Sequence, residues 1–455
     1  MAIADKLIHL DTTKTLLRDA IRRAGHYLPD SATFRSYPYA MLPSEASLGL
    51  DFVRGEYVAH SWRDGTVSRA GLSNIMTTTR PSGGGYFDHL GVYQWAANNV
   101  PRIDHDPATL STSTSSVTLA AGSVTLAVNV AYTVGSYVRA TYDANNWMAG
   151  RVTASTGTSV TLWVDRVVGS GTYASWTVIR VLGLLVEESR TNLLTHSSDF
   201  SNSVWVKSGL AITENAITAP DGTDSADYAY SSGNASIRHT LPATIGTTYS
   251  VSVWMMVPLG LSVGFSLLSG GYGSLALTTV QGTGAWQRVS LTGVATDSLV
   301  RFSLGGGLSW AAGVGIYIWG ADLQAGASPA SHIPTTSAQV TRAADQCVVS
   351  NLTDWLGTDN TIIIEHNAPS GRVLLSSGST VLATSQGPGK LAIAYTATET
   401  RICQAGGSVT TSGPLTFDTS LRLLASASAY ANAHISVVQS IPRALSSDEL
   451  QRITA

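Results

Sequence analysis

Apolar and polar residues alternate along most of this chain, and strict alternation predicts half-buried β-strands. Residues 248–257, TYSVSVWMMV, place Tyr, Val, Val and Met on one face and Ser, Ser and Trp on the other. Residues 313–324, GVGIYIWGADLQ, repeat this pattern, and turn residues separate such segments. The alternation therefore predicts a mostly β protein made of several β-sandwich or jelly-roll modules.

The N-terminal residues follow a different period. Apolar positions recur at alternating intervals of four and three residues, which predicts a short coiled-coil-like α-helix that ends near Gly25. A lone helix cannot bury such a stripe against itself, so we expect it to pack against sister chains, against a docking surface or, alternatively, against its own chain. The positions of the stripe are Ile3, Leu7, Leu10, Lys14, Leu17 and Ile21.

Breaks in these patterns divide the chain into five regions. Prolines follow the predicted helix and end its period. The middle of the chain is rich in Thr, Ser and Val and is predicted to form hairpins with DANN and STGTS loops. A short helix is predicted near residue 450, where Ser446 and Glu449 fit a capping box. The regions are 1–43, a helix and attachment segment; 44–108, a β lead-in; 109–181, a small β domain; 182–345, a β-sandwich; and 346–455, a second β-sandwich.

Composition excludes several classes of protein. Charged residues make up 13% of the chain, against ~25% in an average soluble domain, and the formal net charge is −3. Such a chain has no basic surface for nucleic acid, and its longest apolar runs fall far short of the ~20 residues that span a bilayer. We therefore predict neither nucleic-acid binding nor membrane insertion. For Cys347 and Cys403 we expect buried thiols rather than a disulfide framework.

A group of charges follows the apolar run GLLV. Glu187, Glu188 and Arg190 have three interpretations: an acid–base pair, a metal site or the start of a module. We interpret them as charges that pair locally where a first sandwich strand begins. Residues 104–106, DHD, are interpreted as a polar turn closed by Pro107. The sequence contains no nucleophile elbow, HExxH, P-loop or zinc-spaced Cys/His set, so we predict that the protein is not an enzyme.

Aromatic residues on otherwise polar strand faces have two interpretations. The flat π surface of such a ring suits the C–H face of a sugar, which would make it a stacking platform. Alternatively, a neighbouring domain or subunit covers the ring. The candidates for glycan binding are Trp205, Trp254 and Trp319.

Three stretches resemble one recurring module of tail-fibre and appendage proteins of tailed bacteriophages, which is similar to carbohydrate-binding β-sandwich modules. They are GLLVEESRTNLLTHSSDFSNSVW at 183–205, GAWQRVSLTG at 284–293 and IYIWGADLQAGASPASHIPTTSAQVTRAAD at 316–345. NVPRIDHDP at 99–107 resembles the lead-in that such proteins place a few residues upstream of the module. Because residues 109–181 separate the two here, we infer that the small β domain is an insertion.

The resemblance also implies ligands. The similar sugar-binding modules often hold a structural calcium ion near the first strand, and Asp199 and Asp322 take the matching positions; apart from this ion no cofactor is expected. Residues 346–455, with PRALSSDELQ near their end, resemble laminin-G and concanavalin-like lectin domains. This second resemblance implies weak glycan binding or, alternatively, a trimerising or spacer tip.

Together with the N-terminal helix, the resemblance implies a non-enzymatic virion fibre that is assembled in the host cytoplasm. We expect residues 1–43 to join a homotrimer and to attach it to other phage virion proteins. The β-sandwich modules would bind host surface polysaccharide through several weak sites that act together. The alternatives are a fibre that decorates the head or capsid and, from a different class, a glycan depolymerase.

Overall fold

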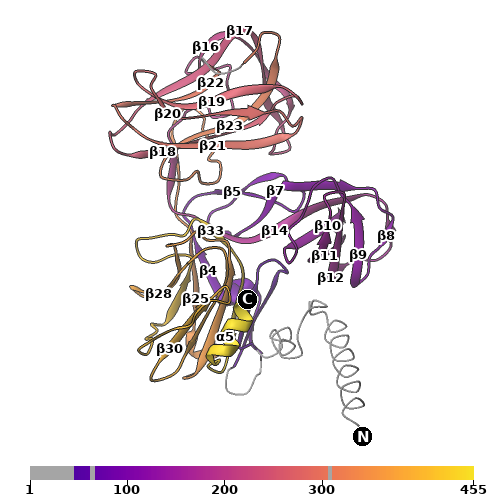
Figure 1. The fold of residues 1–455 in the computed structure, drawn as a ribbon, viewed down its shortest axis with the longest axis vertical. Helices are drawn as coiled ribbons and strands as arrows, with labels where there is room; N and C mark the ends of the chain where they lie inside the picture. Colours follow the sequence, from indigo (N-terminus) through magenta and orange to yellow (C-terminus); the bar gives the residue numbers. More distant parts are fainter. Residues whose placement is uncertain (1–45, 62–66, 306–309) are drawn as a thin grey trace.

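The computed structural model describes residues 46–61, 67–305 and 310–455, and the fold class is mostly β, as predicted (Figure 1). The strands of its large sheets pair antiparallel. None of the helices in these ranges is long and apolar enough to cross a membrane. The predicted N-terminal stripe, Ile3, Leu7, Leu10, Lys14, Leu17 and Ile21, lies outside the described residues. The described helices are α3 (Leu72–Ile75), α4 (Leu352–Trp355) and α5 (Ser447–Thr454).

One β-sandwich is built from the two ends of the described chain. Its strands are β1 (Leu48–Asp51), β2 (Glu56–His60), β3 (Val67–Ala70), β4 (Met76–Thr79), β25 (Gln346–Ser350), β26 (Asn360–His366), β27 (Val373–Ser377), β28 (Thr380–Thr384), β29 (Gly389–Tyr395), β30 (Thr400–Gln404), β31 (Thr410–Ser412), β32 (Ser420–Leu423) and β33 (Ala433–Ile441). Leu50 of β1 lies opposite Val438 of β33, and Thr78 of β4 lies opposite Cys347 of β25. Leu50, Val438 and Cys347 enter one apolar core.

This sandwich differs from the predicted division, which separates residues 44–108 from residues 346–455. The structure pairs strands from both regions and places the other modules between β4 and β25. The reason is physical: alternation shows which side chains of a strand face a core, but it does not show which distant strand lies alongside.

The first inserted module is a small β domain, at the right of Figure 1. Two long strands, β7 (Arg102–Ser113) and β14 (Trp176–Val186), pair with each other and lead into it. Leu126, Val152 and Trp176 are buried in its core. The predicted DANN and STGTS hairpin turns are confirmed. Its other strands are β8 (Val117–Thr118), β9 (Gly122–Ala127), β10 (Tyr137–Asp143), β11 (Asn146–Ser155), β12 (Ser159–Val168) and β13 (Thr172–Tyr173).

Strand β14 joins this module to the sandwich because it changes partner along its length. Residues 177–180 pair with β10, and residues 184–186 pair with β33. Between them lies Gly183, with φ of +102°, at a shift in register with β7. A side chain there would overlap the carbonyl of Ile435 on β33, so glycine meets both the backbone angle and the close approach.

The second inserted module is a β-sandwich, at the top of Figure 1. Its strands are β16 (Val206–Thr218), β17 (Asp224–Pro242), β18 (Thr248–Met256), β19 (Ser262–Ser269), β20 (Ser274–Gln281), β21 (Trp286–Val294), β22 (Leu299–Gly305) and β23 (Gly315–Ala325). The strand order is β20-β19-β22-β17-β23-β18-β21, with β16 beside β17. The predicted alternation is confirmed, because Val251, Val253, Met255, Ile316 and Ile318 all enter the core.

Two short strand pairs lie where the modules meet. They are β5 (Gly84–Phe87) with β6 (Tyr93–Ala96), and β15 (Arg190–Asn192) with β24 (Val340–Arg342). The expectation that the first strand of this sandwich begins beside Glu187, Glu188 and Arg190 is therefore wrong, because residues 190–192 pair with β24 in a separate sheet. The side chain of Asn192 instead donates to the backbone carbonyls of Ala321 and Ile333, at 3.0 and 2.9 Å, and ties the two chain ends of this module together.

Two local predictions are confirmed. Cys347 and Cys403 are free and buried, and burial raises the pKa of the Cys347 thiol to about 12. At the start of α5, the Ser446 hydroxyl accepts from the Glu449 amide at 3.4 Å, and the Glu449 carboxylate accepts from the Ser446 amide at 2.8 Å. This reciprocal capping box satisfies donors that the first helical turn leaves free.

Candidate functional site

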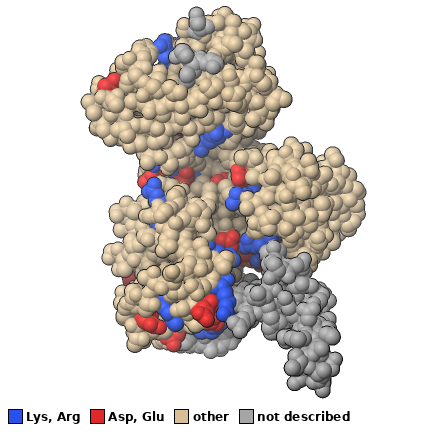
Figure 2. Space-filling view, in the orientation of Figure 1, with Lys and Arg blue, Asp and Glu red and all other residues tan. Residues whose placement is uncertain are grey.

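Charged side chains gather where the modules meet, while large areas of the visible surface carry none (Figure 2). Five of them are buried together and are called the junction cluster: Arg80, Arg102, Glu187, Arg342 and Asp345. Glu187 lies 2.7 Å from Arg102 and 3.5 Å from Arg342. Asp345 lies 2.7 Å from Arg80 and also pairs with Arg102. Buried charges persist only when they are paired, so the cluster joins segments that are far apart in sequence.

The predicted local pairing of Glu187, Glu188 and Arg190 holds in part. Glu188 pairs with Arg190, but the partners of Glu187 come from β7 and β24. Burial alone would raise the pKa of Glu187, but the Arg342 and Arg102 guanidinium groups outweigh burial and hold this pKa far below its usual range. A carboxylate so firmly ionised fastens the modules together and is unsuited to donating a proton.

All three tryptophans proposed from the sequence are buried. Trp205 is 1% exposed and packs in the sandwich core against Phe200 and Phe302. Trp254 and Trp319 lie on the outer face of the sheet, as the alternation predicts, but they are only 5% and 3% exposed. None of the three offers an open ring face to a sugar, so the structure does not support their assignment to a glycan site.

The β5–β6 hairpin covers Trp254 and Trp319. The ring of Phe87 lies 5.3 Å from that of Trp254, and the ring of Tyr93 lies 5.6 Å from that of Trp319, between centroids. The Tyr93 hydroxyl donates to the backbone carbonyl of His332 and anchors the hairpin. For these two tryptophans, the alternative interpretation of cover by a neighbouring segment is therefore confirmed.

The same sheet face carries further aromatic residues that the hairpin leaves accessible. Tyr228 lies opposite Tyr317, Tyr317 opposite Met256, and Met256 opposite Trp286. Residues directly opposite in antiparallel strands point to the same face, so these side chains form one row across β17, β23, β18 and β21. All four are partly exposed, and Tyr230, two residues along β17, is 43% exposed. We call Tyr228, Tyr230, Trp286 and Tyr317 the aromatic face.

The rings of the aromatic face are held in place by their neighbours. The ring centroids of Tyr228 and Tyr317 are 5.0 Å apart, and Trp286 Nε1 donates to the Thr218 carbonyl at 3.2 Å. A side chain at Gly315 would overlap the Tyr228 hydroxyl, so glycine lets that ring lie across β23. The phenolic oxygens have no hydrogen-bond partner in the described ranges of the chain, which leaves them free for a ligand.

The environments of Asp199 and Asp322 do not fit a calcium site. Asp322 is buried and lies 2.9 Å from His332 and 3.4 Å from Arg288, so cationic and polar side chains already occupy its oxygens. Asp199 is half exposed and accepts from the Ser201 hydroxyl at 2.9 Å. Among the residues that the structure describes, no group of three or more His, Cys, Asp or Glu side chains could hold a metal ion.

A lysine ammonium occupies a cage of carbonyl oxygens beside Asp199. Lys207 Nζ lies 2.8 to 3.1 Å from the backbone carbonyl oxygens of Phe200, Ser201, Asn202 and Trp205, which share its three N–H groups. Carbonyl oxygens at a turn are ligands that calcium prefers, and here a covalently attached cation satisfies them instead.

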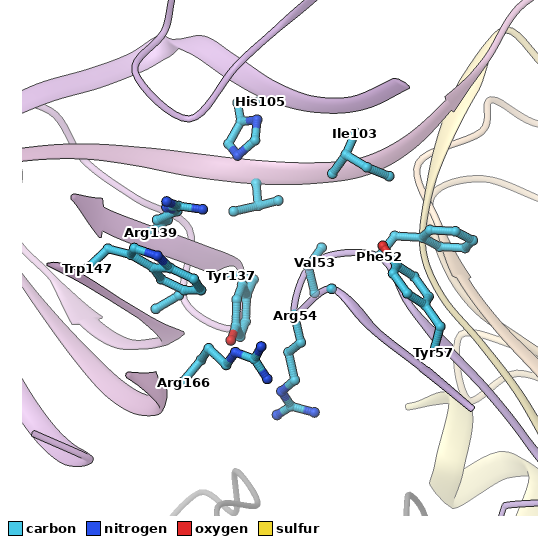
Figure 3. A pocket seen from close by; sticks show the side chains of 13 residues that line it. Phe52, Val53, Arg54, Tyr57, Ile103, His105, Tyr137, Arg139, Trp147 and Arg166 are labelled. Carbon is cyan, nitrogen blue, oxygen red and sulfur yellow. The ribbon is translucent and has the colours of Figure 1, made fainter. Parts of the chain in front are cut away.

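A cavity of about 310 Å³ lies between the small β domain and the β1–β2 turn (Figure 3). Tyr57 lines it from the turn side, Tyr137 and Trp147 line it from β10 and β11, and His105 points into it from β7. The interpretation of residues 104–106 as a turn is wrong, because all three lie within β7. The cavity is the second candidate site, and no pattern in the sequence indicated it.

No protein-family model matches the sequence, and no curated protein matches it. Among solved structures, a CBM4 carbohydrate-binding module is 16% identical over 31% of this chain and 97% of its own, with a TM-score of 0.23. The CBM22-1 xylan-binding domain of Paenibacillus barcinonensis Xyn10C is 9% identical over 30% and 94%, with a TM-score of 0.23. The enzymatically active domain of tailspike protein 4 of bacteriophage CBA120 is 13% identical over 30% and 21%, with a TM-score of 0.23. Likenesses this distant carry no argument about what the chain binds.

The sequence held one signal for the aromatic face. In GVGIYIW, Tyr317 falls on the same strand face as Trp319, which was proposed from its pattern. The position of Tyr317 opposite Tyr228, and the cover over Trp319, both depend on contacts between distant strands. Alternation within a single strand does not contain that information.

Proposed function

We propose that the protein is a non-enzymatic fibre protein that binds polysaccharide on its aromatic face. The observation that carries this proposal is the row of partly exposed rings, in which Tyr228 and Tyr317 lie on adjacent strands and Met256 separates Tyr317 from Trp286. Flat rings at strand spacing can stack on the C–H faces of successive pyranose units, and free phenolic hydroxyls can bond to sugar hydroxyls. The β5–β6 hairpin bounds this surface on one side.

The wider role follows from the sequence resemblance. The fibre would be a virion component of a tailed phage, with residues 1–43 joining sister chains and attaching them to other virion proteins. A trimer carrying one weak face per chain gains avidity, because the second and third contacts form at high effective concentration. The large sheets of the described chain pair antiparallel, which differs from the stacked parallel β-helix typical of phage depolymerases.

Polysaccharide retention by full-length protein tests the binding face. We expect Tyr317→Ala to weaken binding to a panel of immobilised bacterial surface polysaccharides by ~10-fold or more, the loss of one stacked ring. The matched control is Tyr142→Ala, because Tyr142 is 46% exposed on the small β domain, away from the aromatic face. Failure of the wild type to bind any polysaccharide, or equal affinities for Tyr317→Ala and the wild type, would contradict the proposal.

Three further measurements test the rest of the proposal. Deletion of residues 1–43 should leave particles without the protein, and immunogold labelling of intact particles separates a tail position from a head-decorating one. Incubation of bound polysaccharide with the protein should leave its chain length unchanged. Fragmentation of the polysaccharide would overturn the non-enzymatic assignment in favour of a depolymerase.

A further inference from the structure

The cavity in Figure 3 holds an arginine that makes no direct ion pair with any described carboxylate. Arg139 extends from β10 into the cavity, and its guanidinium carbon lies 4.0 Å from the ring centroid of Trp147. Its Nε donates to the Thr141 hydroxyl at 3.0 Å, but no carboxylate in the described ranges pairs with it. Burial lowers the pKa of Arg139 to about 10, and the Asp88 carboxylate, which makes no direct ion pair with it, opposes this fall, so the side chain remains charged at neutral pH.

The other two arginines of the cavity are already neutralised. Arg54 lies 3.2 Å from Asp51 and also pairs with Asp165, and Arg166 lies 2.8 Å from Glu56. Of the three arginines that line the cavity, Arg139 alone makes no direct ion pair among the described residues. A half-buried, unpaired guanidinium is stabilised by an anion that completes its hydrogen bonds.

A histidine provides an acceptor in the same cavity. His105 Nδ1 lies 3.0 Å from the carbonyl oxygen of Phe87, and because a carbonyl only accepts, this nitrogen carries the hydrogen. Burial lowers the pKa of His105 to about 4, so the ring is neutral at pH 7 and its Nε2 is an acceptor. Nε2 has no protein partner within the part of the chain that the structure describes.

We propose that this cavity binds a carboxylate-bearing pyranose, a hexuronate residue. Arg139 would take the carboxylate, His105 Nε2 would accept from a sugar hydroxyl, and the ring of Tyr137 would form an apolar wall. The volume of about 310 Å³ suits one or two sugar rings. Phosphate fits less well, because its dianion brings two negative charges to a single guanidinium that lacks a direct ion pair.

The proposal does not depend on the aromatic face, which lies on a different module. Calorimetric titration of the full-length chain with D-glucuronate, D-glucose and inorganic phosphate tests it directly. We expect glucuronate to bind, glucose to bind ~10–100-fold more weakly because it lacks the charge-assisted bond, and phosphate not to compete. Titration with tri-glucuronate shows whether the cavity binds the terminal sugar of a chain or only a free monosaccharide. Equal affinity for glucose, tighter binding of phosphate, or no binding of any probe would overturn the assignment.

Variants of the cavity locate the bound charge. Arg139→Gln should lose ~10–100-fold in affinity for glucuronate, whereas Arg166→Gln, in the same cavity but with its arginine already paired to Glu56, should stay within ~3-fold. Unchanged thermal melting of both variants shows that the fold persists, and Arg139→Lys, which keeps the charge, should recover part of the affinity. Equal losses in Arg139→Gln and Arg166→Gln would contradict the role of Arg139. Tyr317→Ala should leave glucuronate binding intact, so failure here is distinguishable from failure of the proposed function.

Discussion

Replacement of Glu187 by Gln removes one negative charge from the junction cluster without changing its shape. The two carboxylate oxygens accept from Arg102 at 2.7 Å and from the Ser331 amide and hydroxyl at 2.7 and 2.8 Å. A glutamine amide retains one acceptor oxygen, and its NH2 group must face one of these donors. The substitution therefore leaves Arg102 and Arg342 short of a counterion and brings two donors into contact.

The cost follows from the geometry of the pair. At an effective dielectric constant of ~20, attraction over the 2.7 Å between Glu187 and Arg102 is worth about 6 kcal/mol before desolvation. Removal of one partner from a buried ion pair costs ~3–5 kcal/mol in measured cases. We therefore expect Glu187→Gln to lower the free energy of unfolding of the junction by ~3–5 kcal/mol, a large part of the ~5–15 kcal/mol typical of a domain.

Urea unfolding, followed by tryptophan fluorescence, measures this loss of stability. Because the chain has several modules, limited proteolysis between the modules shows whether the junction opens first. The matched control is Glu188→Gln, because the side chain of Glu188 is 33% exposed, so solvent screens its pair with Arg190 more than it screens the buried pairs of Glu187. Fully exposed pairs contribute ~1 kcal/mol or less, and this partly exposed pair should therefore cost less than those of Glu187. If both variants unfold at the same urea concentration as the wild type, the junction cluster does not hold the modules together and the reasoning is refuted.

The pH dependence of stability tests the role of Glu187 independently. The folded-state pKa of Glu187 lies below its ordinary value of 4.5, because the arginines outweigh burial. Its contribution is therefore fully present above about pH 4.5 and is lost as the pH falls towards the folded-state value. Between pH 7 and pH 3, the wild type should lose stability more steeply than Glu187→Gln, in which this group no longer titrates.

Two further predictions concern the second inserted sandwich. Lys207→Met should lower the stability of this sandwich by ~1–2 kcal/mol, because the carbonyl cage loses its charged donor. Addition of calcium chloride or EDTA should leave the melting temperature of the wild type unchanged. A calcium-dependent rise in the melting temperature of the wild type would show that a metal, and not the ammonium, completes this turn. Gly315→Ala should displace the Tyr228 ring and weaken polysaccharide retention by ~3–10-fold, comparable to the loss of part of one ring contact. Unaltered retention by Gly315→Ala would show that the position of Tyr228 does not matter.

Local patterns predicted the strands well, because alternation records which side chains meet a core. Val251, Val253 and Met255 were placed on the inner face of their strand from the sequence, and they enter the core. The capping box at Ser446 was equally local, since it needs only residues three apart. Features of this kind depend on neighbours in sequence and are therefore readable from one chain.

Features that depend on distant segments were not predictable in this way. The strands of the lead-in complete the C-terminal sandwich because β1 pairs with β33, and no residue of β1 indicates that partner. The resemblance to sugar-binding modules gives Asp322 the position of a calcium ligand, but Arg288 and His332 reach its carboxylate from elsewhere in the fold. The chemistry of a side chain was visible in the sequence, whereas the groups that neutralise it were not.

The junction cluster and the aromatic face are linked through one side chain. Arg102, the partner of Glu187, also donates to the Gly85 carbonyl at 2.7 Å, and Gly85 belongs to the hairpin that covers Trp254 and Trp319. The charge that fastens the modules therefore also holds the cover that limits the aromatic face. Loosening the cluster should expose tryptophan before the sandwich core unfolds, because the hairpin is held by Arg102, by the Tyr93 hydroxyl and by a small aromatic cluster, whereas the core is held by a much larger apolar cluster. The extent of the proposed binding surface is thus set at the junction.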